Sequence, residues 1–380
     1  MDNYDYIISG SGAAGMSLLY RMMRHPGFAN KKILVVDRAI KNTNDHTWCF
    51  WEEERGVFES VVCHQWQNVH FYSNHFSGLL NLAPYQYKMI RSVDLYNLVM
   101  DEAAKHDNIT FLYGKITSLV NEGNKALLIV DSMHITADYI FNSILVEPYT
   151  IPKGKHHLLQ HFKGFVIATT APVFKPDEAT LMDFRVSQQH GTTFMYVLPV
   201  AANKALVEYT LFTKKLLQQE QYSTAIKAYI KDVLHITEYK VIEEEFGVIP
   251  MTNIYFVKQE GRVVNMGTAG GQTKPSTGYT FRFIQKQCDA IIVGLLNGKF
   301  LSKTTFNDKK FHLYDSVLLN VLANNRLPGD EVFTKMFQRN RAENVLKFLD
   351  NETNLRQDIG IISSFPVLPF LKAGFQEVFK

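Results

Sequence analysis

The feature that most constrains this chain is the motif Gly10-Ser11-Gly12-Ala13-Ala14-Gly15 near its N-terminus. An apolar, β-prone run, residues 4–9, precedes the motif, and a helix-like segment, residues 14–24, follows it. A G-x-G-x-x-G pattern in this strand, turn and helix context is typical of a dinucleotide site. Gly10 permits the sharp turn, Gly12 lets a pyrophosphate approach the backbone, and Gly15 lets the helix lie close to the strand. The free N–H groups at the helix N-terminus would then bind the phosphates. We therefore assign to cofactor binding Gly10, Gly12, Ala13, Ala14 and Gly15.

A second element of the same site follows along the chain. Residues 31–37 read Lys-Lys-Ile-Leu-Val-Val-Asp, which predicts a short buried strand that ends in a carboxylate. Asp37 lies 22 residues after Gly15, close to the spacing of the acid that binds a ribose hydroxyl. A chance glycine loop in an α/β protein is the alternative, but the loop, its context and the acid together favour a dinucleotide site. A motif so early in a chain of this length is more typical of FAD enzymes than of NAD enzymes.

The composition excludes several classes of protein. With 380 residues the chain can bury a large core and form two or three subdomains. Its 40 basic and 37 acidic residues nearly balance and form no basic block, so we expect no nucleic acid partner. The three cysteines form no C-x-x-C pattern, which argues against a disulfide framework or a metal site. Because no apolar run approaches ~18 residues and no signal peptide is recognisable, we expect a cytoplasmic protein.

The rest of the chain is organised into β-rich and helical stretches. Residues 46–51 are strongly aromatic and predict a loop that either plugs the core or packs on a cofactor or an apolar substrate. Residues 65–90 alternate like antiparallel strands, and residues 139–143 predict a buried strand that returns to the nucleotide domain. A second β-rich stretch covers residues 156–208. The C-terminal part is mostly helical, with an apolar proline turn over residues 365–371 before a short final helix.

Two glutamates occur where a carboxylate is unexpected. Glu208 lies inside the apolar run Ala205–Phe212. Strand alternation favours a solvated face for this side chain, and burial for chemistry is the alternative. Glu245 ends a run of three acids, which is usually solvated, but a turn predicted over Gly247–Pro250 gives it a defined position. Both side chains are therefore candidates for acid–base chemistry.

A second glycine-rich loop, residues 267–279, lies between a predicted strand, residues 262–267, and a predicted helix, residues 281–296. This arrangement suits a loop that closes over a flavin, with the helix N-terminus facing an anionic part of the cofactor. We add to the cofactor-binding set Arg91, at the start of another predicted helix, and the loop residues Gly267, Gly270, Thr277, Gly278 and Tyr279.

Six motifs in order resemble those of the bacterial, flavin-dependent lycopene cyclases over nearly the whole chain. Besides the glycine loop they are Asp45-His46-Thr47-Trp48-Cys49-Phe50, Leu181-Met182-Asp183 through Gln188-Gln189-His190-Gly191 to Phe194-Met195-Tyr196-Val197-Leu198-Pro199, Leu206-Val207-Glu208-Tyr209-Thr210, Glu245-Phe246-Gly247-Val248-Ile249-Pro250, and Ala269-Gly270 to Pro275-Ser276-Thr277-Gly278-Tyr279. Each motif alone is weak, but their shared order is specific. This chain departs from the family at Tyr209, where relatives often carry a second acid, and at Cys49, where serine is more usual.

The resemblance implies a flavoprotein fold of the p-hydroxybenzoate-hydroxylase type. We therefore expect an α/β fold in which a discontinuous FAD-binding Rossmann-like domain (residues 1–62, 88–150 and 255–300) carries an inserted antiparallel β-sheet substrate domain (residues 63–87 and 151–254), followed by a C-terminal helical region (residues 301–380). The resemblance also implies cyclisation of the ψ ends of lycopene, and of other acyclic-ended carotenoids, to β-ionone rings without net redox change. Reduced FAD with NAD(P)H as reductant is the implied cofactor system, and Glu208 is the implied essential glutamate.

The implied chemistry accounts for the residue types. A hydrocarbon offers no polar handle, so apolar and aromatic walls must position it, and 13% of the residues are aromatic. Protonation, ring closure and proton loss require an acid, a base and a dry site that stabilises a cation. We predict Glu208 for proton transfer, with Glu245 as the second candidate, and no metal. The predicted substrate pocket consists of His46, Trp48, Phe50, Phe194, Tyr196 and Pro199.

Because lycopene dissolves in membranes, we expect a peripheral membrane contact. Residues 365–371 with Lys372 are the candidate surface, and core packing is the alternative. Two other functions stay open. A flavin-dependent reductase or hydroxylase of an isoprenoid or aromatic substrate usually carries a Gly-Asp pair where this chain reads Met266-Gly267-Thr268. A non-catalytic carotenoid- or FAD-binding protein would retain flavin without turnover.

Overall fold

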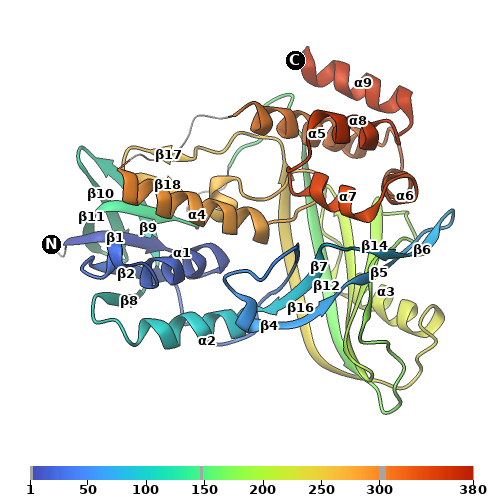
Figure 1. Ribbon diagram of the computed structural model, residues 1–380, viewed down its shortest axis with the longest axis horizontal. Helices are drawn as coiled ribbons and strands as arrows, with labels where there is room; N and C mark the ends of the chain where they lie inside the picture. The colour runs from blue at the N-terminus through green and yellow to red at the C-terminus, as the bar shows by residue number, and fades with distance from the viewer. Residues whose placement is uncertain (1–2, 146–148, 299–304, 380) are drawn as a thin grey trace.

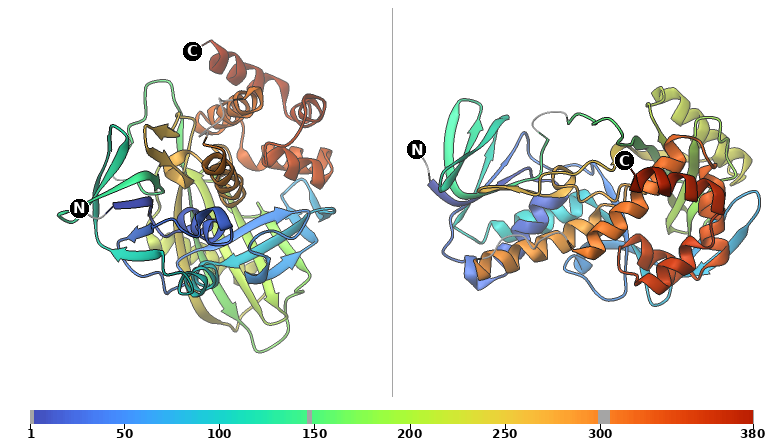
Figure 2. Two further views of the ribbon diagram at one scale, coloured as in Figure 1. Left: turned by 60° about the vertical axis from the view of Figure 1, so that its left-hand side comes forward. Right: turned by 90° about the horizontal axis from the view of Figure 1, so that it is seen from above.

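The computed structural model describes residues 3–145, 149–298 and 305–379. These residues form β-sheets of eight, seven and three strands, together with helices on their faces. The eight-stranded sheet lies at one end of the elongated molecule and the seven-stranded sheet at the other, with the C-terminal helices above the latter (Figures 1 and 2).

The eight-stranded sheet contains the parallel strands expected for a nucleotide domain. β1 (Asn3–Ser9) pairs in parallel with β2 (Ile33–Asp37) and with β11 (Met133–Asn142), so the chain returns to this domain at residues 139–143 as predicted. The strand order is β17 (Gln259–Glu260), β18 (Val263–Asn265), β11, β1, β2 and β8 (Ile109–Tyr113), and β10 (Lys125–Val130) and β9 (Ile116–Glu122) extend from β11.

Both faces of this sheet are buried, which explains the continuous apolar runs of β1 and β2. Ile8 packs with α1 (Ala13–Met23), α2 (Ser92–Ala103) and α4 (Phe281–Asn297) in one core cluster. Ile7, on the opposite face, packs with side chains of β10 and β11 in another. This packing fixes the start of α1 against the end of β1.

The seven-stranded sheet is antiparallel except where β13 pairs with β5. Its order is β16 (Lys240–Thr252), β12 (His157–Ala168), β15 (Lys204–Thr213), β14 (Thr192–Ala201), β13 (Glu178–Asp183), β5 (Asn68–Tyr72) and β6 (Ser77–Asn81). One face packs against α3 (Gln219–Asp232) through Val207 and Tyr209. The other face carries Phe194 and Tyr196 and packs with the C-terminal helices.

A three-stranded sheet of β3 (Thr47–Glu52), β7 (Gln86–Arg91) and β4 (Val62–Trp66) completes the β structure of the described residues. The loop predicted at residues 46–51 is therefore wrong, because β3 forms a regular antiparallel pair with β7. The aromatic side chains of this stretch therefore extend from a regular strand and not from an irregular loop. Trp48 and Phe50 both stack on Phe281, the first residue of α4.

The described residues after 304 form α5 (Phe306–Ala323), α6 (Gly329–Arg339), α7 (Ala342–Leu349), α8 (Leu355–Ile362) and α9 (Val367–Val378). The proline turn predicted over residues 365–371 is wrong from Val367 onward, because α9 begins there. Pro369 lies in the first turn of this helix, where a missing N–H costs no intrahelical hydrogen bond. None of the helices in the described ranges is both long and apolar enough to cross a membrane. The domain boundaries stay a prediction.

Candidate active site

The glycine loop has the geometry that its motif predicts. Gly10 has a φ of +96°, in the left-handed region that favours glycine. A Cβ at Gly15 would lie 1.9 Å from the carbonyl oxygen of Gly10, so only glycine allows α1 to pack so closely. A Cβ at Gly12 would meet nothing within 4 Å. The space beside Gly12 and the first N–H groups of α1 is therefore open to a ligand.

Asp37 ends β2 beside this loop. Its Oδ2 accepts hydrogen bonds from the backbone N–H of Ser11 at 2.6 Å and from the hydroxyl of Ser11 at 2.7 Å. The carboxylate thus holds the glycine loop in place. Ala13 begins α1 and Ala14 is buried behind it.

The late glycine loop packs against the first one. Gly267 has a φ of +58°, and a Cβ there would lie 2.9 Å from the Cβ of Ala14. The N–H of Gly267 donates to Oε1 of Gln287 at 3.0 Å, which ties the loop to α4. A Cβ at Gly270 would lie 2.3 Å from the carbonyl oxygen of Asn265, so the short helix at residues 267–270 requires glycine here. The two predicted cofactor loops are neighbours.

Arg91 has a different neighbour. It lies at the end of β7, and its Nη2 forms an ion pair with Glu243 of β16 at 3.2 Å. The structure thus brings it together with the seven-stranded sheet. Its assignment to cofactor binding stays a prediction.

Glu208 and Glu245 lie on the two strands that flank β12. In the strand registers, Gly164 of β12 is paired with Glu208 of β15 on one side and with Glu245 of β16 on the other. A Cβ at Gly164 would lie 3.0 Å from Cγ of Glu245 and 2.8 Å from Cδ1 of Leu206. The glycine therefore leaves the space into which the two carboxyl side chains extend.

Each carboxyl group receives one hydroxyl donor. Thr210 donates to Oε1 of Glu208 at 2.7 Å, and Thr47 donates to Oε2 of Glu245 at 2.7 Å. Burial and the adjacent charge of Glu245 raise the pKa of Glu208 well above its usual range. Oε1 of Glu245 is buried without a hydrogen-bond partner among the described residues. It can accept a hydrogen bond from a proton on Glu208. Burial raises the pKa of Glu245 as well, while its hydrogen bonds with Thr47 and Glu208 act in the opposite direction.

The two glutamates line a cavity of about 110 Å³, which we call the carboxyl cavity. Its walls are mostly aromatic and aliphatic, and they include Trp48, Tyr87, Phe162, Tyr196, Leu198, Leu206, Ile249, Tyr279 and Phe281. Burial and nearby carboxyl charges raise the pKa of the Cys49 thiol, which also lines the cavity. The cavity is thus a mostly apolar site that contains two carboxyl groups.

Two further buried polar atoms mark the side of the cavity next to the late loop. Oε1 of Gln160 and Oγ1 of Thr277 have no hydrogen-bond partner among the described residues. A Cβ at Gly278, whose φ is +73°, would lie 1.9 Å from Oε1 of Gln160. Unsatisfied buried polar groups are rare, and this pair suits a bound group with a polar edge.

The structure brings some predicted pocket residues together and leaves others apart. Trp48, Tyr196, Gly278 and Tyr279 line the carboxyl cavity. His46 stacks on Trp48 at the cavity's edge. Phe50 is buried against Phe281, Phe194 packs among other aromatic rings of the core, and the carbonyl of Pro199 accepts the indole N–H of Trp66. These three residues support the cavity without lining it.

Other residues of the cavity are not evident from the sequence. Gln160, Phe162 and Gly164 lie on β12, outside every motif. One signal points to Phe162: a Cβ at Gly247 would lie 2.2 Å from its ring, so the glycine of the E-x-G motif makes room for it. The turn predicted at Gly247–Pro250 is wrong, because these residues lie inside β16.

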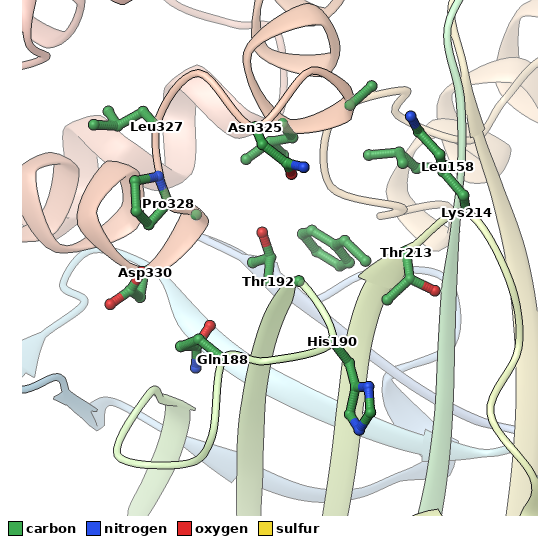
Figure 3. Close-up of a pocket in the computed structure, with 15 residues that line it drawn as sticks. Leu158, Gln188, His190, Thr192, Thr213, Lys214, Asn325, Leu327, Pro328 and Asp330 are labelled. Atoms are coloured by element: carbon green, nitrogen blue, oxygen red, sulfur yellow. The ribbon is translucent and has the colours of Figure 1, made fainter.

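A separate cavity of about 460 Å³ lies between the β13–β14 connection and the α5–α6 turn. Figure 3 shows Gln188, His190 and Thr192 on one side of it and Asn325 and Pro328 on the other. Neither glutamate lines this cavity. It offers no comparable arrangement for proton transfer.

A parallel nucleotide sheet with a glycine loop, joined to a largely antiparallel sheet that carries the carboxyl cavity, defines a flavoprotein fold. The flavoprotein/dehydrogenase from Cytophaga hutchinsonii superimposes with a TM-score of 0.61 over 100% of both chains, at 12% sequence identity. The fold class predicted from the sequence is confirmed.

The sequence pattern of the lycopene cyclase protein family matches residues 5–374, so this chain belongs to that family. It is 23% identical to a lycopene beta-cyclase of Pseudescherichia vulneris over 76% of this chain and 73% of that protein. It is also 23% identical to the chloroplastic lycopene beta cyclase of Arabidopsis thaliana, over 72% of this chain and 56% of the plant protein.

Proposed function

We propose that this protein is a lycopene beta-cyclase, which converts the ψ ends of lycopene to β-ionone rings and so forms β-carotene by way of γ-carotene. The observation that carries the proposal is the carboxyl pair in a cavity with mostly aromatic and aliphatic walls. Membership of the lycopene cyclase family supports the same substrate class. The reaction is an isomerisation, so one proton enters and one proton leaves for each ring.

Glu208 is the proposed acid. Its raised pKa favours the protonated form of the carboxyl group, and in this proposal that proton is transferred to C2 of the ψ end. The cation at C1 is attacked by the C5=C6 bond, which moves the positive charge to C5. Glu245, with its unpartnered Oε1, is the proposed base that accepts the C6 proton. A proton then passes between the two carboxyl groups and restores the starting state.

The walls of the carboxyl cavity stabilise the cation while they exclude water. Trp48, Tyr196 and Tyr279 line the cavity. An aromatic face contributes about 1–2 kcal/mol to a nearby cation when both are desolvated. The thiol of Cys49 stays protonated because of its raised pKa, so it is a poor nucleophile toward the cation.

FAD is the proposed cofactor, and the chain's own residues fit it. Gly12 and the start of α1 leave room for the pyrophosphate, Asp37 lies at the loop, and Thr277 and Gln160 supply unpartnered polar atoms beside the carboxyl cavity. Reduced FAD would supply negative charge close to the developing cation. NAD(P)H is the proposed reductant that maintains the reduced form.

A peripheral membrane contact is the proposed route to the substrate. Helices α8 and α9 carry exposed apolar side chains that we call the docking patch: Leu355, Ile359, Ile362, Val367, Leu368, Leu371, Phe375, Val378 and Phe379. Arg356 and Lys372 are exposed on the same helices. Apolar anchors with basic neighbours are typical of helices that lie in a lipid interface.

An anaerobic assay on lycopene-loaded liposomes tests the function. The protein is supplied with FAD and either dithionite or NADPH, and products are separated by chromatography. We expect β-carotene only when FAD is reduced, without stoichiometric consumption of NADPH. Intact lycopene beside steady NADPH consumption would overturn the proposal and favour a flavin reductase or hydroxylase. Bound flavin without any turnover would favour a carrier.

A further inference from the structure

A large apolar groove lies among the C-terminal helices. It has a volume of about 840 Å³ and is bounded by α5, α6, α7 and α9. Its lining includes Phe333, Met336, Phe348, Phe370 and Phe375. The groove is much larger than the carboxyl cavity, which has room for only a small part of a long hydrocarbon.

The polar groups at the bottom of the groove are already paired. Ser276 donates to Oδ1 of Asp315 at 2.6 Å, and Lys274 forms an ion pair with the same oxygen at 2.9 Å. All three residues are buried. The buried polar groups beside the groove are therefore paired with one another, and the lining is predominantly apolar, which suits a hydrocarbon ligand.

The groove and the carboxyl cavity are lined by neighbouring residues of the late glycine loop. Ser276 lines the groove, whereas Gly278 and Tyr279 line the cavity. Three residues of extended chain span at most about 10 Å. Both spaces also border the same core cluster, which contains Tyr196 on the cavity side and Phe333 on the groove side.

The groove is also continuous with the docking patch. Val367, Leu371 and Phe375 line the groove, yet they are 64%, 64% and 66% exposed. Their i, i+4, i+8 spacing places them on one face of α9. Side chains that are shared in this way connect the proposed lipid contact to the groove.

We propose that this groove binds the remote part of the substrate's hydrocarbon chain while one ψ end lies at the carboxyl pair. This inference rests on the proposed function for the identity of the hydrocarbon. The chain of a C40 carotenoid extends well beyond the carboxyl cavity, and the groove is the apolar space next to that cavity's wall. Binding of the remote chain would supply affinity that the small cavity alone cannot supply.

Two glycines provide a matched pair of variants. Gly374 lines the groove, and a Cβ there would meet nothing within 4 Å. Gly360 on α8 is equally open, but it does not line the groove. Both lie inside helices of the docking patch. Gly374→Trp fills the groove, and Gly360→Trp adds the same side chain outside it.

The experiment compares lycopene with a shortened, ψ-ended analogue that ends before the groove. Both are supplied in detergent micelles, which removes differences in membrane docking. For Gly374→Trp we expect kcat/KM for lycopene to fall at least about tenfold. A tenfold loss corresponds to about 1.4 kcal/mol, which is the burial free energy of fewer than two CH₂ groups. Its kcat/KM for the analogue stays at the wild-type value, and Gly360→Trp changes neither. Equal kcat/KM values of Gly374→Trp and wild type for lycopene would overturn the proposal.

Binding without chemistry separates this proposal from the proposed function. Protein-bound lycopene is measured by its absorbance after gel filtration, with oxidised FAD so that no turnover occurs. We expect Gly374→Trp to retain less lycopene than wild type and Gly360→Trp to retain as much. If Gly374→Trp retains less lycopene but wild type forms no β-carotene under reducing conditions, the proposed cyclase function is refuted. The groove proposal then stands as a carotenoid-binding site. Equal retention by all three proteins would overturn the groove proposal whether or not cyclisation occurs.

Discussion

Glu208 and Glu245 are both paired in register with Gly164, one from each neighbouring strand. The sheet thus holds two carboxyl groups on either side of a residue that has no side chain. Burial raises the pKa of both carboxyl groups, and the charge of Glu245 raises the pKa of Glu208 further. This relationship supplies an acid and a base from the same sheet face.

Removal of the proposed acid should abolish turnover and leave the fold intact. Glu208→Gln keeps the shape and the hydrogen bond from Thr210 but cannot transfer a proton. We expect the rate to fall by about 10²–10⁴, the usual contribution of general acid–base catalysis. β-Carotene formation on liposomes measures the rate, and bound flavin absorbance is the control. Near-normal turnover of Glu208→Gln would remove this residue from the mechanism.

The raised pKa of Glu208 also predicts a pH-dependent stability. Above the ordinary glutamate value of 4.5 the unfolded chain loses this proton, whereas the folded protein retains it until its raised pKa is reached. The folded state binds more protons in this interval, so stability falls as pH rises. Glu208→Gln removes this dependence. The Tm of Glu208→Gln should therefore rise relative to that of wild type as pH increases above 4.5.

Differential scanning fluorimetry at a series of pH values measures this Tm difference. Glu243→Gln is a useful comparison, because Glu243 lies on the same strand but is half-exposed and paired with Arg91. A pH-independent Tm difference for Glu208→Gln would contradict a protonated Glu208.

Gly164→Ala should weaken the carboxyl pair. The new Cβ would lie 3.0 Å from Cγ of Glu245, so Glu245 must move relative to Glu208. We expect at least about a tenfold loss of kcat, since small displacements of catalytic groups are costly. Gly78→Ala on β6 is the control outside the site, because its Cβ would also lie 3.0 Å from a side chain, the half-buried Phe76 ring. If both variants retain full activity, the spacing set by Gly164 is unimportant.

Gly12→Asp tests the cofactor site. The position is open in the folded chain, so we expect an unchanged Tm for the flavin-free protein. A carboxylate beside the pyrophosphate should lower FAD affinity by more than about tenfold, because like charges repel strongly at short distance. Fluorescence titration with FAD measures the affinity. An affinity equal to that of wild type would show that FAD does not approach Gly12.

The docking patch can be tested without changing the groove. Ile359 and Leu368 are 68% and 80% exposed and do not line it. The double variant Ile359→Asp/Leu368→Asp should reduce liposome binding by more than about tenfold, since each buried apolar side chain contributes ~1.5–3 kcal/mol. Val293→Asp, on exposed α4 surface, should not. Equal cosedimentation of all three proteins with liposomes would place the membrane contact elsewhere.

Much of the nucleotide domain could be predicted because its signals are local. The spacing of Gly10, Gly12 and Gly15 specifies a turn between a strand and a helix, and Asp37 ends the next strand. The environment of Glu208 was harder to predict. Alternation correctly places it on the opposite face of β15 from Val207 and Tyr209, which pack against α3. The pattern does not reveal that the opposite face borders the carboxyl cavity, where burial raises the pKa of Glu208.

The carboxyl cavity could not be predicted in full because distant segments complete it. Thr47 comes from β3, Gln160 and Phe162 from β12, and Tyr87 from β7. Thr47 lies in a motif, but Tyr87, Gln160 and Phe162 lie outside all of them. Tertiary pairing also overrides the aromatic loop predicted at residues 46–51, which β7 orders into a strand.

The most direct test of the account is cyclisation of lycopene in D₂O. If Glu208 exchanges its proton with solvent and delivers it to C2, each ring formed must carry one non-exchangeable deuterium. Mass spectrometry of β-carotene should therefore show one added mass unit per ring, without consumption of reductant. Unlabelled β-carotene, or a product enlarged by two hydrogens per end, would contradict acid-catalysed cyclisation by this protein.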